Sequence, residues 1–322
     1  GDVYKRQASA RAEEVHTAGA AVKTYQFLSA TDSVGRGLGE TWTCDDPLDG
    51  KTAHTVFRRI EPARNGRLWL YEAEITHGRR HQIRRHAAAA GLPLLGDADY
   101  ALPDFPRLAL HCREVRWPGL GAPLVSTCPD SFAAALKGVG LDEIHLHACL
   151  EARGSWPASV TDAWRVVHRD EIPDLPAAID LYGDACVCSW FGDPEADLSR
   201  LNDIARLVRH RYRSRLMVER RHRRNPHQEG LVDGIIGGGS GDPEGRHTVH
   251  EHGLQYEITF FATQHLGLFL DQRDTRRRLT RRARGARMAN LFAYTCSFSV
   301  AAAAAEADVV FSVDTARACL QT

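Results

Sequence analysis

Residues 77–86, HGRRHQIRRH, place four arginines and three histidines within ten positions, and an apolar segment, AAAAGLPLLGD, follows them. A guanidinium group donates two parallel hydrogen bonds to a carboxylate or a phosphate, so the cluster is suited to binding an anion. The Gly-Leu-Pro turn and the leucine pair after it indicate a folded core rather than a solvated helix. We interpret the segment as an anion-binding site on a packed scaffold.

A second group of candidate residues lies in residues 286–314, ARMANLFAYTCSFSVAAAAAEADVVFSVD. An apolar strand, a loop of small residues, an Ala-rich helix and a strand that ends in Asp314 form the first half of a nucleotide-binding βαβ unit. In such a unit the loop and the helix N-terminus approach a cofactor, and the terminal acid binds ribose hydroxyls. The spacing fits NAD or S-adenosylmethionine equally, because no GxGxxG motif is present.

Composition places these sites in a soluble globular chain. The 322 residues are 43% hydrophobic and 25% charged, enough for two domains with proper cores. The formal net charge of zero conceals two arginine-rich runs, residues 206–224 and 273–287, which could face solvent or RNA. No apolar run is long enough to span a membrane. Eight cysteines without disulfide-like spacing, and no signal peptide, predict reduced thiols in a cytoplasmic protein.

The elements that must position the two sites differ along the chain. Strand-like segments such as LWLYEAEIT dominate the first part, whereas strands and helices alternate in the second. Both ends look cut, so we expect a fragment. The predicted organisation is an adapter-derived tail at 1–7, a strand-rich domain at 8–137, a helical linker at 138–160, a small subdomain at 161–250 and a cofactor-binding domain at 251–322.

Four ordered motifs in the first domain, KTYQF, HGRRHQIRRH, GLPLLGDADY and RLALH, resemble the C-terminal part of the RluA-type pseudouridine synthases. The resemblance implies that Tyr25 is a base or ring-packing partner of the target uridine and that Arg79 ion-pairs a nucleophilic Asp. Such a pair lowers the carboxyl pKa by roughly 1–3 units. Arg80, Arg84 and Arg85 would contact RNA phosphates. No stretch like the family's nucleophile motif precedes Tyr25, so we expect half of an active site and no uridine isomerisation by the chain alone.

The second domain resembles the RlmI-type and related class I methyltransferases of large-subunit rRNA, on GLFLDQRDTRR followed by NLFAYTCSFSV and SVD. The resemblance implies S-adenosylmethionine as cofactor. It places Asp314 at the ribose and a second group at the other end of the cofactor. The implied loop residues are Phe292, Tyr294, Thr295, Cys296 and Ser297, and the second group is Asp271, Gln272 and Arg273.

Cys296 and Ser297 stand where that family has a glycine pair. If the backbone there has positive φ, each replacement costs roughly 1 kcal/mol, and cofactor affinity would be weak.

We therefore expect a fused RNA-modifying enzyme that combines α+β and α/β parts. Its first sheet should be mixed and mainly antiparallel, and a small subdomain and the start of a doubly wound methyltransferase sheet should follow. RNA, with rRNA favoured, is the expected partner, and we expect no metal. An alternative is a non-catalytic RNA-binding module that keeps only Arg–phosphate contacts, which the missing upstream Asp motif would favour. A third, an NAD-dependent enzyme, would be indicated by tight NAD retention.

Overall fold

The computed structural model falls into two compact units, Gly1–Glu151 and Ala152–Thr322. It describes residues 21–100, 105–118, 121–154, 156–157, 159–193, 195–221, 246–260 and 266–315, and the backbone of 232–235. The predicted tail at 1–7 and the glycine-rich segment 237–245 lie outside the described residues. Within these ranges no helix is long and apolar enough to cross a membrane, and the seven cysteines are all free thiols.

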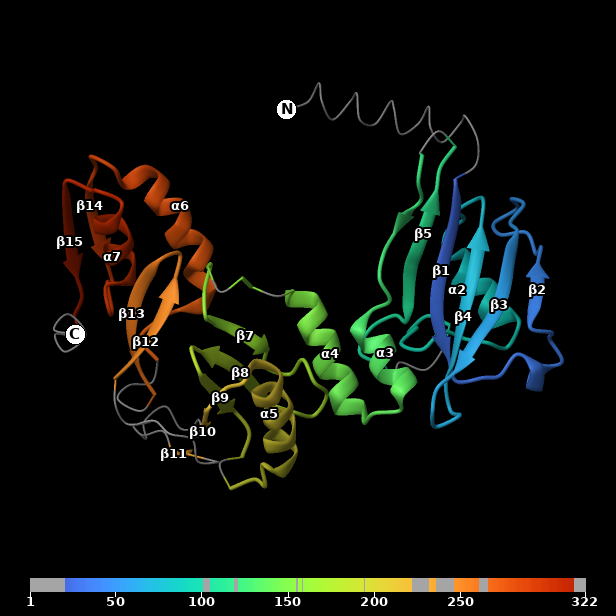
Figure 1. Cartoon of the computed structure of the whole chain (residues 1–322), viewed down its shortest axis with the longest axis horizontal. Helices are drawn as coiled ribbons and strands as arrows, with labels where there is room; N and C mark the ends of the chain where they lie inside the picture. Colours follow the sequence, from blue (N-terminus) through green and yellow to red (C-terminus); the bar gives the residue numbers. More distant parts are fainter. Residues whose placement is uncertain are drawn as a thin grey trace. The chain divides into compact units, whose positions relative to one another are not determined.

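The first unit is built on a six-stranded sheet in the order β2-β3-β4-β1-β5-β6 (Figure 1). All neighbouring strands in it are antiparallel, in agreement with the predicted mainly antiparallel sheet, although it contains no parallel pair among the described strands. The strands are β1 (Val22–Ser29), β2 (Thr41–Cys44), β3 (Thr55–Pro62), β4 (Trp69–Ile75), β5 (Leu110–Arg116) and β6 (Leu124–Val125), with a 3₁₀ turn, η1 (Val34–Arg36), after β1.

Successive side chains of a strand point to opposite sides of a sheet, and helices cover both sides of this one. Phe27 of β1 is buried in a cluster with Ile83 of α2 (Gln82–Ala89). Leu28, the next residue, is buried in a second cluster with Phe132 of α3 (Asp130–Lys137) and Ile144 of α4 (Leu141–Arg153). The helix α2, which carries the arginine cluster, is thus fixed against the centre of the sheet.

The second unit contains a five-stranded sheet in the order β11-β10-β9-β8-β7. Its strands are β7 (Ala163–Val167), β8 (Ala177–Tyr182), β9 (Ala185–Trp190), β10 (Leu216–Arg221) and β11 (Val232–Ile235). Only β9 and β10 are parallel, and α5 (Ser199–Tyr212) makes the crossover that parallel neighbours require. The strand–helix alternation in the sequence therefore produces one parallel pair within a mainly antiparallel sheet.

The hairpin of β12 (Arg246–Glu251) and β13 (Leu254–Thr259) shares a hydrophobic core with one face of that sheet. After it come η2 (Leu270–Gln272) and α6 (Arg273–Ala283). Arg276 of α6 is 1% exposed and donates two hydrogen bonds of 2.7 Å to the buried Glu251 carboxylate of β12. This bidentate pair ties the helix to the hairpin.

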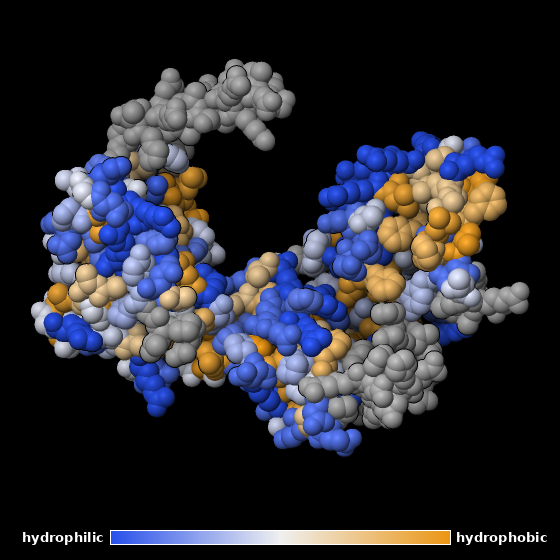
Figure 2. Space-filling model, turned by 180° about the vertical axis from the view of Figure 1, so that it is seen from behind, coloured by the Kyte–Doolittle hydropathy of each residue, from blue (hydrophilic) through white to orange (hydrophobic). Residues whose placement is uncertain are grey.

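The C-terminal part of the second unit has the predicted βαβ order. β14 (Arg287–Leu291) and β15 (Val309–Val313) are parallel, and α7 (Ser297–Ala304) lies between them in the sequence. Apolar side chains such as Leu291 and Phe311 are exposed on these strands, and Figure 2 shows the resulting apolar surface over this part of the molecule. The short loop between β14 and α7 is the predicted cofactor loop.

Candidate active sites

One arginine of the cluster at 77–86, Arg84, binds carboxylates that belong to the protein itself. Arg84 donates from Nε to Asp97 Oδ2 at 2.8 Å and from Nη2 to Asp97 Oδ1 at 2.5 Å, and Nη2 also lies 2.6 Å from Asp99 Oδ2. The Asp97 side chain is fully buried, and the Arg84 guanidinium lies 5.0 Å from the Tyr100 ring centre. The apolar segment GLPLLGD is thereby fastened to α2.

The pair also sets the charge state of Asp97. Burial alone would raise its pKa, but the hydrogen bonds from Arg84 and from the backbone N–H groups of Asp99 and Tyr100 outweigh burial and lower the pKa. Asp97 is therefore a permanently ionised anchor near neutral pH.

The other predicted cations of this cluster have different surroundings. Arg79 donates from Nε to the Thr52 carbonyl at 3.0 Å. Arg80 is exposed, and Arg85 donates from Nη1 to both carboxylate oxygens of Asp49 at 3.1 Å. The RNA contacts expected for Arg80, Arg84 and Arg85 stay predictions, and the sequence did not reveal that two of these side chains have carboxylate partners.

Tyr25 lies half-buried on β1 between β4 and β5, opposite Ala73 and Cys112. Its ring packs against the apolar cluster that contains Ile83 of α2. Burial, and then the neighbouring Cys112 thiol, raise the pKa of Tyr25 above its usual value. A phenol keeps its proton near neutral pH with or without this shift, so the roles of base and of ring-packing partner both stay predictions.

A buried polar network beneath α2 was missed from the sequence. Gln82 Nε2 donates to Thr55 Oγ1 at 3.0 Å, and Thr55 Oγ1 lies 2.9 Å from His86 Nδ1. His86 Nε2 lies 3.0 Å from the Asp46 carbonyl, which can only accept. The arrangement assigns the proton to Nε2, and the Thr55 hydroxyl then donates to Nδ1. His86 is thus a structural residue rather than a phosphate ligand.

The cofactor loop follows β14 in the chain and is hydrogen-bonded to the end of the parallel strand β15. The Tyr294 N–H donates to Asp314 Oδ2 at 2.8 Å, and the Ala293 N–H donates to the Val313 carbonyl at 3.0 Å. Thr295 Oγ1 donates to the Gly267 carbonyl in the segment before η2. The predicted acid, Asp314, therefore directly holds the predicted loop.

The loop backbone is unusual, because Phe292, Tyr294 and Cys296 have φ of 58°, 49° and 62°. Non-glycine residues rarely adopt this left-handed conformation. Ser297 begins α7 and does not have positive φ. The expected strain at both replaced glycines is therefore wrong for Ser297, which a helical position accommodates, and holds for the conformation of Cys296.

The predicted group at 271–273 is divided between two environments. Asp271 is exposed and accepts a hydrogen bond of 2.9 Å from Gln272 Nε2. Arg273 is 6% exposed, donates from Nη2 to the Ala163 carbonyl at 2.8 Å and lies 4.4 Å from the Trp156 ring centre. Burial lowers the pKa of Arg273. The cofactor role expected of all three stays a prediction, although Arg273 is already engaged within the protein.

The donor set around the loop fits a nucleoside cofactor. A carboxylate stands at the end of β15, the backbone turns into the N-terminus of α7, and the Phe292 side chain is 88% exposed beside them. The Phe269 ring centre lies 5.4 Å from that of Tyr294, so the segment before α6 borders the same site. Within the described residues, no cluster of His, Cys, Asp or Glu could hold a metal ion.

Comparisons with known proteins support two enzyme classes in one chain. Residues 7–89 match the family model described as RNA pseudouridylate synthase, and residues 212–322 match that described as S-adenosylmethionine-dependent methyltransferase. The chain thus joins segments related to these two enzyme families, and S-adenosylmethionine is the cofactor of the second.

Curated relatives point to the methyltransferase more narrowly. The chain is 34% identical over 161 residues to ribosomal RNA large subunit methyltransferase K of Neisseria meningitidis, covering 48% of this chain and 43% of the relative. It is 32% identical over 176 residues to methyltransferase K/L of Dichelobacter nodosus, covering 50% and 22%. The chain spans less than half the length of these relatives.

Proposed function

We propose that this chain takes part in RNA modification, and that its second unit serves methyl transfer from S-adenosylmethionine to large-subunit ribosomal RNA. The observation that carries the proposal is the hydrogen bond between the Tyr294 N–H and Asp314 Oδ2, which closes a cofactor loop on a parallel βαβ unit. The matching family model and the names of the curated relatives support the same activity and substrate.

Each predicted cofactor residue has a proposed task except Arg273, which is already engaged within the protein. The Asp314 carboxylate accepts hydrogen bonds from the ribose hydroxyls, and the loop residues from Phe292 to Ser297 line the nucleoside. Asp271 and Gln272 face the amino-acid end. When bound, the cofactor supplies an electrophilic methyl group, and the protein contributes positioning.

Calorimetric titration of the full chain with S-adenosylmethionine tests this assignment. Asp314→Asn keeps an acceptor for the Tyr294 N–H but loses the charge. Hydrogen bonds to a charged group contribute about 1.5–3 kcal/mol, so affinity should fall about 10- to 150-fold. Asp308→Ala, an exposed acid just before β15, is the matched control and should bind normally. Equal affinity of Asp314→Asn and the original chain would refute the ribose role.

For the first unit we propose the RluA type of pseudouridine synthase, with Tyr25 and Arg79 on the uridine side of the site. The four ordered motifs and the family match over residues 7–89 support it. Because we expect half of an active site, the chain alone should release no tritium from RNA labelled at uridine C5, and release would refute that expectation. Tritium release after the chain is extended by an upstream Asp-containing segment would support the RluA type, whereas RNA binding without release by the extended chain would favour the non-catalytic RNA-binding module.

The subtype of the methyltransferase is a finer proposal. The motifs resemble the RlmI type, whereas the curated relatives carry the names K and K/L. Mapping the methylated nucleotide in large-subunit rRNA after reaction with the chain distinguishes these specificities.

A further inference from the structure

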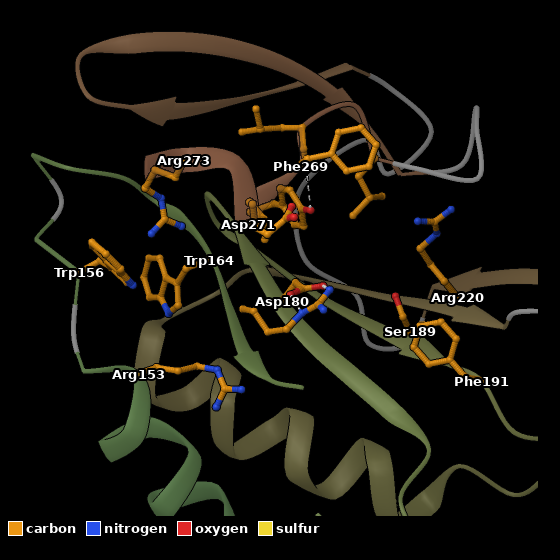
Figure 3. A pocket seen from close by; sticks show the side chains of 15 residues that line it. Arg153, Trp156, Trp164, Asp180, Ser189, Phe191, Arg220, Phe269, Asp271 and Arg273 are labelled. Atoms are coloured by element: carbon orange, nitrogen blue, oxygen red, sulfur yellow. Dashed lines mark hydrogen bonds and ion pairs between the residues drawn. The ribbon is translucent and has the colours of Figure 1, made fainter. Parts of the chain in front are cut away.

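A cleft of about 640 Å³ in the second unit lies outside all the residues predicted from the sequence except Asp271 and Arg273. It opens on the face of the five-stranded sheet that also packs against the β12–β13 hairpin (Figure 3). Tyr182 and Val187 form the hydrophobic core on that face. Beyond them the same face becomes polar, which a purely structural sheet would not require.

The floor of the cleft is a row of polar side chains on adjacent strands. Arg165 of β7 donates to both oxygens of Asp180 of β8, at 2.8 and 3.0 Å. Ser189 of β9 and Arg220 of β10 are register partners and continue the row. Burial raises the pKa of Asp180, and the Arg165 fork opposes that rise. Because a buried carboxylate is costly unless it is paired, the row is a built feature of the sheet.

The ends of the cleft are aromatic. Figure 3 shows Trp156 and Trp164 together at one end, with Arg273 beside them, and Phe191 near Arg220 at the other. Aromatic rings that stack on bases, with guanidinium groups along the phosphates, are the usual elements of single-stranded nucleic-acid sites.

Four arginines and two aspartates line the cleft: Arg153, Arg165, Arg220, Arg273, Asp180 and Asp271. Three of the arginines have acidic partners: Arg165 pairs with Asp180, Arg153 lies 2.7 Å from Glu171, and Arg273 lies 3.7 Å from Glu251. A guanidinium group carries five N–H donors, so the arginines along the cleft can also donate hydrogen bonds to an RNA phosphodiester.

The cleft adjoins the proposed cofactor site. Phe269 and Asp271 line the cleft, and the Phe269 ring contacts Tyr294 of the cofactor loop. We propose that this cleft binds one unstacked nucleotide of the acceptor RNA, with its base stacked at the Trp156–Trp164 end. The inference rests on the proposed methyltransferase function and adds the place where the RNA enters.

The test is the affinity of the full chain for a dye-labelled single-stranded RNA of about 12 nucleotides, a length within the usual range of such sites, by fluorescence anisotropy. Trp156→Ala is the main variant, because this side chain is 36% exposed. Loss of one base–aromatic stack should weaken RNA binding about 5- to 150-fold. Leu207→Ala, on α5 and 37% exposed, is a control of matched exposure outside the cleft and should bind normally.

Trp164 also contacts Tyr212 of α5, with ring centres 5.4 Å apart, so Trp164→Ala is paired with Trp164→Phe, which keeps a stacking ring. Phenylalanine should retain most of the RNA affinity that alanine loses. S-adenosylmethionine affinity, measured by calorimetry, should be unchanged in all of these variants, whereas Asp314→Asn should lose it and still bind RNA.

Unchanged RNA affinity of Trp156→Ala would overturn the inference, as would a parallel loss of cofactor affinity. Absence of cofactor binding by the original chain would instead refute the proposed methyltransferase function.

Discussion

The backbone of the cofactor loop leads to a prediction of opposite sign for two adjacent residues. Cys296 is the N-cap of α7 with φ of 62°, whereas Ser297 is the first residue of the helix. Glycine at position 296 relieves a left-handed conformation that costs about 1–2 kcal/mol, but the more flexible unfolded chain returns about 0.5–1 kcal/mol. Cys296→Gly should therefore stabilise the loop by about 0.5–1 kcal/mol.

Ser297→Gly has no strain to relieve. It adds only the flexibility of glycine within the first turn, so it should destabilise the helix start by about 0.5–1 kcal/mol. The two variants should differ by about 1–2 kcal/mol, and each serves as the control for the other.

Amide hydrogen exchange at Val300 is the direct assay. Its N–H donates to the Cys296 carbonyl at 2.9 Å, so its exchange reports the opening of this turn. Cys296→Gly should slow the exchange about two- to fivefold, and Ser297→Gly should accelerate it by a similar factor. Faster exchange in Cys296→Gly, or equal shifts in both variants, would refute the strain argument. Tighter binding of S-adenosylmethionine by Cys296→Gly would link the strain to cofactor affinity.

Three further predictions concern the buried ion pairs. Arg84→Met strands the Asp97 carboxylate and should cost the first unit about 3–5 kcal/mol, measured by hydrogen exchange in β1 during urea titration; a loss below 1 kcal/mol would contradict the anchoring role. Because the pKa of Asp97 is lowered in the folded state, its carboxylate stabilises the first unit above about pH 4, and this stabilisation is lost as the pH falls through the pKa of the folded state. Asp97→Asn should therefore reduce the loss of unfolding free energy at acid pH. If that loss were unchanged in the variant, Asp97 would not be its source. Arg276→Met should lower the unfolding free energy of the second unit by about 3–5 kcal/mol, and adding Glu251→Leu should restore part of that loss. If the losses of the two single variants simply added in the double variant, the two side chains would not be coupled.

The sequence was most informative where one local rule determined the result. The order strand, loop, helix, strand and Asp314 led to the β14–α7–β15 unit, because parallel strands joined by a helix have few alternatives. The arginine cluster was interpreted as an anion-binding site on a packed scaffold. Arg84 in this cluster pairs with Asp97, only eleven residues beyond the end of the cluster, and Arg85 pairs with Asp49. A charge cluster predicts that an anion is bound, but not whether the anion belongs to the protein, and the RNA contacts expected of the cluster stay predictions.

The replaced glycine pair shows how precisely a helix boundary can be predicted from the sequence. Two adjacent substitutions in one motif looked equivalent, yet one residue caps the helix and the other begins it. A shift of one position along the backbone changes φ from left-handed to helical. Helix boundaries cannot be located that finely from the sequence, because caps of different types compete within one or two residues.

The cleft residues could not be assembled from the sequence at all. Asp180 and Ser189 are separated by nine positions and lie in strands that read as ordinary apolar segments, AAIDLY and ACVCSW. Each of these two strands contributes one polar residue to the cleft, and a single polar residue in an apolar strand does not predict a binding site. Only the sheet register brings Arg165 opposite Asp180 and Ser189 opposite Arg220, all on the face away from α5. The register depends on long-range pairing across four strands, so the proposed RNA site becomes visible only when that pairing is known.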